Sequence, residues 1–140
     1  MKVLVTGGAG FIGSYLVEAL IRARYQVLVV SDGARGSVPQ PARFLKLDVL
    51  SPKLRAALVN FAPEYVCHLA AQPSVQNSIS DPVHDAEVNI VGSLNVIESA
   101  RAAHVRKLLF VSSAAVYGEA KELPTSEEAL LQPASPYALA

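Results

Sequence analysis

Short apolar runs without polar alternation recur along the chain and alternate with segments of helical period. Strands that are buried on both faces, as in parallel sheets, have this continuous apolar character. The predicted strands are Val3–Thr6, Val27–Ser31, Arg43–Leu47, Tyr65–Leu69 and Leu108–Ser112. Because helices separate them, right-handed crossovers favour an α/β fold with a doubly wound parallel sheet of about five strands in the order 3-2-1-4-5.

The segments between these runs have the spacing of amphipathic helices. The first predicted helix is Phe11–Arg22, and its apolar face consists of Leu16, Ala19, Leu20 and Ala23. Ser51 followed by Pro52 is typical of a capped helix start and predicts a second helix that ends near Asn60.

A long third helix is predicted from Pro82 to about Ala103. Its apolar residues recur near helical spacing and are Val88, Val91, Leu94, Val96 and Ile97. The segment Asp32–Ala42 is a loop rich in Gly and Pro, and Gly118–Pro136 is a long connection before a last helix begins. We find no repeat and no linker, so residues 1–140 are expected to form one domain.

The composition narrows the class of protein. Half of the residues are apolar, and twelve basic residues balance twelve acidic ones, so no net field recruits nucleic acid or an acidic membrane. No run of roughly 18 apolar residues could span a bilayer. Cys67 is the single cysteine, which excludes an internal disulfide, fits a reducing cytoplasm and is expected to fill space on a buried strand.

The most informative segment joins the first strand to the first helix and contains Gly7, Gly10, Phe11, Ile12 and Gly13. The first glycine suits a tight turn, the second lets a diphosphate approach the main chain, and the third lets the helix pack closely on the sheet. Since the free N–H groups and positive dipole end of the helix then face the phosphates, the sequence predicts a Rossmann-type dinucleotide site.

Several motifs in order resemble the NAD-dependent epimerase/dehydratase family, a group of extended short-chain dehydrogenases/reductases that includes UDP-glucose 4-epimerase. The matching segments are Thr6–Gly13, Asp48-Val49, His68–Gln72, Asn89–Ser93, Ser112–Gly118 and Ser135–Tyr137. They cover the N-terminal, cofactor-binding portion of such enzymes, and the substrate domain has no counterpart here. The later motifs also disfavour a general SAM- or FAD-binding Rossmann domain.

Acidic residues after the second and third strands are candidate nucleoside contacts. Asp32 lies about 20 residues beyond the glycine turn, where an acid holds the adenosine ribose, although most relatives carry that acid at the position of Ser31. Asp32 favours NAD, whereas Arg35 in the next loop keeps NADP open. The resemblance implies that Asp48 accepts the adenine amino group and Val49 lines the ring; Asp48 could also be a helix cap.

The segment after the fourth strand is expected to lie beside the cofactor. Its residues are Leu69, Ala70 and Ala71, whose small side chains allow a close approach to the backbone. His68 is interpreted as a structural residue of a buried strand. In the family, the positions of Asn89 and Gly92 hold the strand and helix together. His84 and His104 have no evident partners, and no metal-ligand cluster is predicted.

The resemblance assigns the proposed chemistry to two residues. Ser113 hydrogen-bonds a substrate hydroxyl or keto oxygen, and Tyr137 transfers the proton that accompanies hydride transfer to the nicotinamide. The family pattern is Tyr-x-x-x-Lys, which would place the lysine at 141, one helical turn later. The resemblance therefore implies an NAD-dependent sugar-nucleotide epimerase or dehydratase, as a short form or as the N-terminal portion of one; a dinucleotide-binding module without turnover is the alternative.

We expect the sheet to be uncovered near the fifth strand, because later elements of such enzymes would normally cover it. Exposed apolar surface of this kind favours self-association. The sequence therefore also predicts a homodimer or larger assembly. It does not name the sugar nucleotide.

Overall fold

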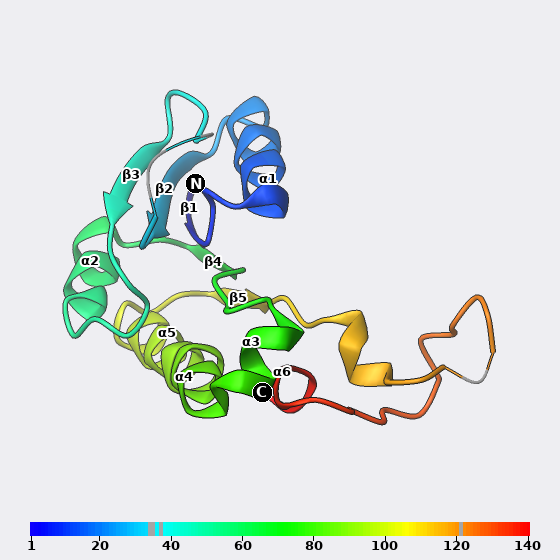
Figure 1. The fold of residues 1–140 in the computed structure, drawn as a ribbon. Coiled ribbons are helices and arrows are strands. Elements are labelled where there is room, and N and C mark those ends of the chain that lie inside the picture. Colours follow the sequence, from blue (N-terminus) through cyan, green and yellow to red (C-terminus); the bar gives the residue numbers. More distant parts are fainter. Residues whose placement is uncertain (34–35, 37, 121) are drawn as a thin grey trace.

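A computed structural model describes residues 1–33, 36, 38–120 and 122–140. Among these residues, five strands form one parallel sheet in the order β3-β2-β1-β4-β5 (Figure 1). The strands are β1 (Lys2–Thr6), β2 (Gln26–Ser31), β3 (Arg43–Lys46), β4 (Tyr65–His68) and β5 (Lys107–Phe110). This order confirms the predicted Rossmann-type doubly wound sheet.

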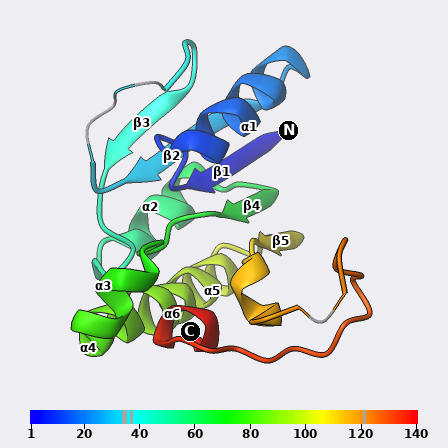
Figure 2. The same ribbon diagram turned by 45° about the vertical axis from the view of Figure 1, so that its right-hand side comes forward.

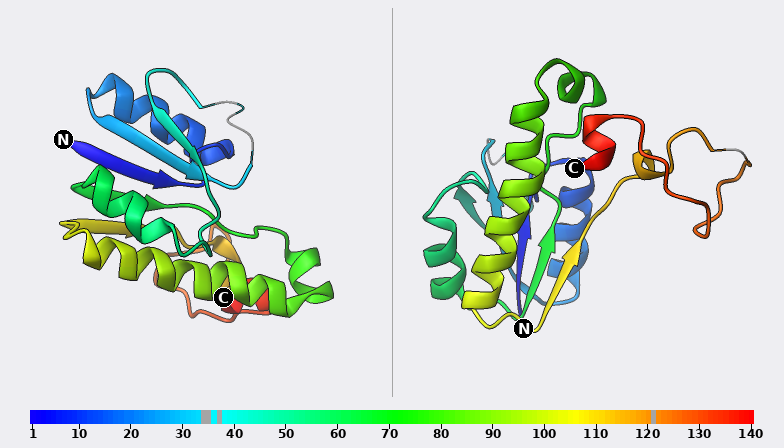
Figure 3. Two further views of the ribbon diagram at one scale, coloured as in Figure 1. Left: turned by 90° about the vertical axis from the view of Figure 1, so that its left-hand side faces the viewer. Right: turned by 90° about the horizontal axis from the view of Figure 1, so that it is seen from below.

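Helices cover both faces of the sheet (Figure 3). The α-helices are α1 (Phe11–Arg22), α2 (Leu54–Phe61), α3 (Val75–Ser80), α4 (Pro82–Ala86), α5 (Gly92–Ala102) and α6 (Pro136–Leu139). A π-helical turn, η1 (Glu87–Val91), joins α4 to α5, and a 3₁₀ turn, η2 (Ala114–Tyr117), follows β5. Helix α1 lies on one face, whereas α2 and α5 lie on the other.

Two apolar clusters form the core, one on each face of the sheet. Alternate residues of a strand point to opposite faces. Leu4 of β1 therefore packs with Leu58 and Val96 on the side of α2 and α5. Its neighbour Val5 packs with Val17 on the side of α1. The apolar runs lack polar alternation because both of these faces are covered.

The buried face of α1 differs from the predicted one. Val17 is fully buried, with Leu16 and Leu20 packed beside it, but Ala19 and Ala23 are exposed. Each helical residue advances by about 100°, so Ala19 lies about 200° around the helix from Val17. The apolar stripe is centred on Val17, and the two alanines lie outside it.

The start of α2 also differs from the prediction. The helix begins at Leu54, and Ser51 and Pro52 belong to a turn before it. The N–H of Leu54 donates to the carbonyl oxygen of Ser51 at 3.0 Å, and the Ser51 hydroxyl accepts from the N–H of Lys53 at 3.3 Å. The Ser-Pro signal therefore closes a turn rather than capping the helix.

The predicted long helix is divided, and most of its expected apolar stripe is exposed. Val91, Leu94 and Ile97 are 53%, 55% and 43% exposed, whereas Ser93 and Val96 are buried. A π-helical turn contains one extra residue, so the spacing of an uninterrupted α-helix no longer follows one face. Helix α5 packs against the sheet through a face that contains polar as well as apolar residues.

Helix α3 was not predicted from the sequence. Its N-cap is Ser74, whose hydroxyl accepts from the N–H of Asn77 at 3.2 Å. Residues 118–120 and 122–135 project away from the sheet, and α6 returns the chain to α3 and α4 (Figure 2). At the sheet edge, Leu109 and Phe110 of β5 are exposed. Within the described residues, no helix combines the length and apolar character needed to cross a membrane.

Candidate functional site

A cavity of about 770 Å³ opens at the carboxyl ends of the strands. Parallel α/β sheets bind ligands at this end, where strand order reverses around β1 and β4. All of the residues selected from the sequence line it, namely Gly7, Gly10, Phe11, Ile12, Gly13, Asp32, Asp48, Val49, Leu69, Ala70, Ala71, Ser113 and Tyr137. The structure thus brings them together, and their individual roles remain predictions.

The glycine turn between β1 and α1 forms the centre of the cavity wall. Gly7 has a φ of 67°, a left-handed conformation that side chains rarely adopt, and a Cβ there would lie 2.7 Å from the main-chain nitrogen of Ala70. A Cβ on Gly13 would collide with the carbonyl oxygen of Gly7 and lie 2.6 Å from the Cα of Gly8. The sequence had suggested that Gly13 lets α1 pack closely on the sheet. In the structure, Gly13 instead allows α1 to pack on the glycine turn itself.

The N-terminus of α1 opens into this cavity. Gly10 is the N-cap residue, and Phe11 and Ile12 in the first turn are 81% and 63% exposed. The first N–H groups of a helix have no intrahelical acceptor, and they carry the positive end of the helix dipole. Of the described residues that line the cavity, none is Lys or Arg. An anion bound here would therefore meet main-chain amides.

The two predicted nucleoside-binding acids lie on the wall formed by β2 and β3. Ser31 and Asp32 at the end of β2 both line the cavity, and Arg35 lies outside the described residues. Asp48 follows β3, and its Oδ1 accepts from the N–H of Leu50 at 2.7 Å. Since α2 begins later in the chain, Asp48 stabilises a local turn and does not cap that helix.

His68 lies behind the cavity wall and is 2% exposed. Its Nδ1 lies 2.6 Å from the Thr6 hydroxyl, and its Nε2 lies 2.9 Å from the Ser93 hydroxyl. Burial lowers the pKa of His68 to about 4, so the ring is neutral near pH 7. This agrees with its interpretation as a structural residue. On the same strand, burial raises the pKa of the Cys67 thiol, which packs in the core on the α1 side.

Asn89 and Gly92 hold α5 and the preceding turn against the cavity wall, in agreement with their predicted packing role. The Asn89 side chain accepts from the N–H of Gln72 at 2.8 Å and donates to its carbonyl oxygen at 3.1 Å. A Cβ on Gly92 would lie 2.8 Å from Cγ2 of Val49.

The candidate catalytic residues lie on the opposite wall. Ser113 follows β5, and its hydroxyl accepts from the N–H of Ala115 at 3.2 Å. Tyr137 lies in α6, where Ser135 caps the helix by accepting from the N–H of Ala138 at 3.1 Å and Pro136 is the first helical residue. The predicted last helix is confirmed, and it begins at Pro136.

Sequence analysis missed part of the cavity lining. Gln72, Pro73, His84 and Val88 line the wall near α3 and α4. Gln72 belongs to a motif that was noted, and His84 and Val88 lie in the predicted helix from Pro82, but the sequence does not show that these residues face the strand ends. No group of three potential metal-binding side chains occurs in the part of the chain that the structure describes.

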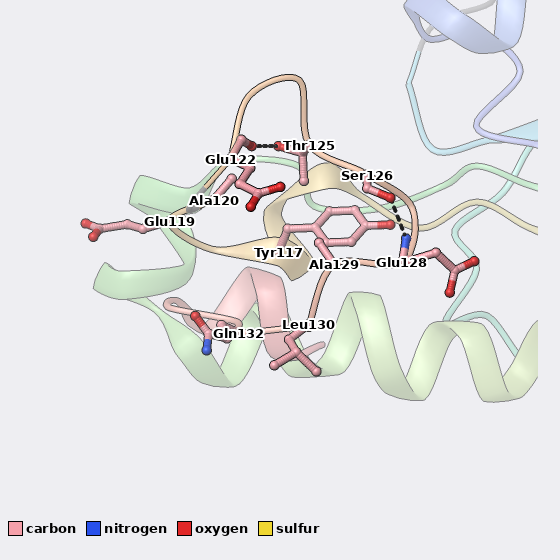
Figure 4. Close-up of a pocket in the computed structure, with 10 residues that line it drawn as sticks. All are labelled: Tyr117, Glu119, Ala120, Glu122, Thr125, Ser126, Glu128, Ala129, Leu130 and Gln132. Atoms are coloured by element: carbon pink, nitrogen blue, oxygen red, sulfur yellow. Dashed lines mark hydrogen bonds between the residues drawn. The ribbon is translucent and has the colours of Figure 1, made fainter.

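A second cavity, of about 310 Å³, lies within the projecting segment between Tyr117 and Gln132 (Figure 4). Glu119, Glu122 and Glu128 line it, and none of the predicted site residues does. Three carboxylates would repel a phosphate group. The cavity at the strand ends is therefore the candidate dinucleotide site.

A sequence model of the NAD dependent epimerase/dehydratase family matches residues 3–140. The chain belongs to this family. A UDP-glucose 4-epimerase of Mycolicibacterium smegmatis is 43% identical over 147 residues, which is 99% of this chain and 47% of that protein. Members of the epimerase/dehydratase family thus match the whole described sheet and its cavity.

Solved structures of epimerases have the same fold. The Thermus thermophilus UDP-glucose 4-epimerase in complex with NAD matches with a TM-score of 0.92 and 44% identity, over 99% of this chain and 47% of that one. The Thermotoga maritima UDP-glucose 4-epimerase with UDP-glucose gives a TM-score of 0.92 and 39% identity, over the same shares of the two chains. This family member therefore spans about half the length of the relatives it matches.

Proposed function

We propose that residues 1–140 form the dinucleotide-binding domain of an NAD-dependent sugar-nucleotide epimerase. The observation that carries this proposal is the cavity at the strand ends, into which the glycine turn and the N-terminus of α1 open. Main-chain amides at that helix end are suited to a diphosphate. The NAD complex of the Thermus thermophilus relative supports the same ligand for this chain.

The residues on the β2–β3 wall would bind the adenosine half of NAD. The carboxylate of Asp32 accepts hydrogen bonds from ribose hydroxyls, and its charge disfavours the 2′-phosphate of NADP. One carboxylate oxygen of Asp48 accepts a hydrogen bond from the N–H of Leu50. The Asp48 carboxylate is also the proposed acceptor for the adenine amino group. Val49 lines the adenine ring. The cofactor would lie along Leu69, Ala70 and Ala71. The small side chains of this segment would let it approach the main chain closely.

Ser113 and Tyr137 would carry the sugar chemistry. When bound, NAD supplies a hydride acceptor. As the phenolate, Tyr137 would take the proton of the sugar hydroxyl while the hydride on the same sugar carbon goes to the bound NAD, and the phenol would return the proton when the carbonyl is reduced again. Ser113 donates a hydrogen bond to the same sugar oxygen. Both residues line the cavity wall beyond β5, which supports their action on one substrate. UDP-glucose and UDP-galactose are the proposed substrates.

Two measurements test this proposal. Calorimetric titration with NAD and NADP should give tighter binding of NAD, and incubation with NAD and UDP-galactose should give UDP-glucose with transient absorbance of reduced nicotinamide. NAD binding without either signal would mean that residues 1–140, which span about half the length of the relatives, act as a binding module without turnover. Absence of heat with both dinucleotides would overturn the whole proposal.

We further propose a homodimer or larger assembly in the cytoplasm. The support for assembly is an exposed apolar stripe on η1 and α5 formed by Ile90, Val91, Leu94 and Ile97. The support for location is the lone cysteine. Sedimentation should show an assembly that Leu94→Glu dissociates. Val59→Glu is the matched control, because Val59 is a similarly exposed residue on α2. A monomeric parent would contradict the proposal.

A further inference from the structure

Buried polar side chains form a continuous network behind the cavity wall. It runs from Thr6 at the end of β1 through His68 of β4 to the Ser93 hydroxyl of α5, which bonds to the main-chain carbonyl oxygen of Asn89 in η1. All four side chains are buried. Burying polar groups lowers stability unless each one is hydrogen-bonded. The network therefore requires a defined set of donors and acceptors.

The direction of each hydrogen bond follows from Ser93. Its hydroxyl donates its single proton to the carbonyl oxygen of Asn89 at 2.6 Å, so it can only accept from His68. The proton of the neutral imidazole is therefore on Nε2, and Nδ1 is an acceptor. Thr6 consequently donates its hydroxyl proton to Nδ1 at 2.6 Å.

This orientation leaves the Thr6 oxygen free to accept from the main chain of the cavity wall. The N–H groups of Leu69 and Ala70 each point to Thr6 Oγ1 at 3.2 Å. Ala70 is the residue whose main-chain nitrogen lies against Gly7. The Asn89 side chain fixes the main chain of Gln72 by accepting from its N–H and donating to its carbonyl oxygen. The network thus holds residues 69–72 at both ends.

We propose that His68 is a positioning residue, which in its Nε2–H form holds the 69–72 segment against the glycine turn at the distance a dinucleotide requires. This inference rests on the proposed function, since the ligand is the dinucleotide of that site. His68 does not line the cavity. It acts through Thr6 and Ser93.

A protonated ring would break this pattern, because Nδ1–H would replace the acceptor that Thr6 needs. The groups that face the ring are Thr6 from β1, Ser93 from α5 and the Phe110 ring of β5, whose centroid is 5.5 Å away. The carboxylate of Asp85 lies farther along the network, where it accepts from the Asn89 side chain at 3.1 Å. Burial keeps the pKa of His68 near 4 and preserves the neutral form.

Two pairs of variants separate positioning from general stability. Ser93→Ala removes the acceptor of His68, and Ser99→Ala is its control, because Ser99 is equally buried in α5 and its hydroxyl lacks a hydrogen-bond partner among the described residues. His68→Phe removes both ring hydrogen bonds. His68→Gln carries an adjacent acceptor and donor and should restore part of the function.

The test combines two readouts on the whole chain. The first is NMR of the free protein, which reports the His68 tautomer and the hydrogen exchange of the Leu69 and Ala70 amides. The second is calorimetric affinity for NAD from pH 5 to pH 8. We expect an Nε2–H ring, faster amide exchange in His68→Phe and Ser93→Ala, and about tenfold weaker NAD binding in both. Ser99→Ala should match the parent, and His68→Gln should recover at least half of the lost binding free energy.

Each other outcome has a definite meaning. An Nδ1–H ring, or unchanged amide exchange in His68→Phe, would overturn the network. Faster exchange with unchanged NAD affinity would overturn the positioning role while leaving the proposed function intact. A parent that releases no heat with NAD would instead overturn the proposed function, and the positioning role with it. A folded His68→Phe, checked by its thermal transition, is required for these comparisons; if it is unfolded, Ser93→Ala decides the same outcomes.

Discussion

Gly13 and Gly10 offer the sharpest test, because the structure gives them different consequences. A methyl group at Gly13 would collide with the carbonyl oxygen of Gly7 and approach the Cα of Gly8 at 2.6 Å. These are main-chain atoms that no rotamer change can move. Overpacking typically lowers stability by 1–3 kcal/mol, and we expect Gly13→Ala at the upper end, about 3 kcal/mol. For a domain of this size, that corresponds to a Tm lower by roughly 10 °C.

Gly10→Val is the matched variant. Gly10 has a φ of −78°, which any residue adopts, and its added Cβ would meet only the carbonyl oxygen of Gly7, at 3.2 Å. We expect a stability loss of about 1 kcal/mol, since valine is a poor N-cap residue. NAD affinity should nevertheless fall at least tenfold, about 1.4 kcal/mol, because the side chain would occupy the approach to the helix amides.

Thermal unfolding and NAD calorimetry on the same preparations separate the two effects. Gly13→Ala should lose both affinity and about 3 kcal/mol of stability, whereas Gly10→Val should lose affinity with a stability loss of only about 1 kcal/mol. A Gly13→Ala protein with the Tm of the parent would refute the packing argument. A Gly10→Val protein that binds NAD as the parent does would refute the placement of the diphosphate.

Three further predictions concern single side chains. Asp32→Ser should raise the affinity for NADP relative to NAD, because it removes a charge that repels the 2′-phosphate; an unchanged ratio in calorimetry would count against the ribose assignment. Tyr137→Phe should keep NAD affinity within about threefold but lower any epimerase turnover by at least about a hundredfold, and equal turnover would exclude Tyr137 as the proton-transfer group. The pKa of His68 is about 4 in the folded protein and 6.5 as its ordinary value, so the unfolded chain binds the additional proton between these pH values. The free energy of unfolding should then fall by up to about 3 kcal/mol as the pH falls from about 6.5 to about 4, and urea titrations should show a smaller pH dependence for His68→Phe.

The sequence predicted the sheet better than the helices. The central runs, such as Val3–Thr6, lie between two covered faces, so their composition alone identifies them. The predicted buried face of α5 was wrong, because binary patterning assumes that the apolar residues of a helix face the core. Here Ser93 and Asn89 are buried because they bond to His68, Gln72 and each other. Hydrogen-bond partners that lie far apart in the sequence cannot be identified from the periodicity of apolar residues.

The site was predicted largely from motifs at strand ends. The parallel sheet explains why this worked, since the carboxyl ends of β1, β2, β4 and β5 meet at one edge. Gln72 was missed because its placement depends on α3, a short helix with a weak periodic signal. His84 was missed although it lies in the predicted helix from Pro82, because the periodicity does not show that this helix start faces the strand ends. The packing of Gly13 on Gly7 was also inaccessible, because it depends on the path of the turn and not on residue type.

The absence of Lys and Arg from the described lining of the cavity has a consequence for how a ligand would be held. The amides of α1 are electrically neutral, and the charged groups nearby include the carboxylates of Asp32 and Asp48. A diphosphate would be recognised by the directions of N–H groups rather than by ionic attraction. Within the described lining, dissolved salt would screen the repulsion by Asp32 and Asp48 rather than an attraction, so these residues give no reason for binding to weaken as ionic strength rises.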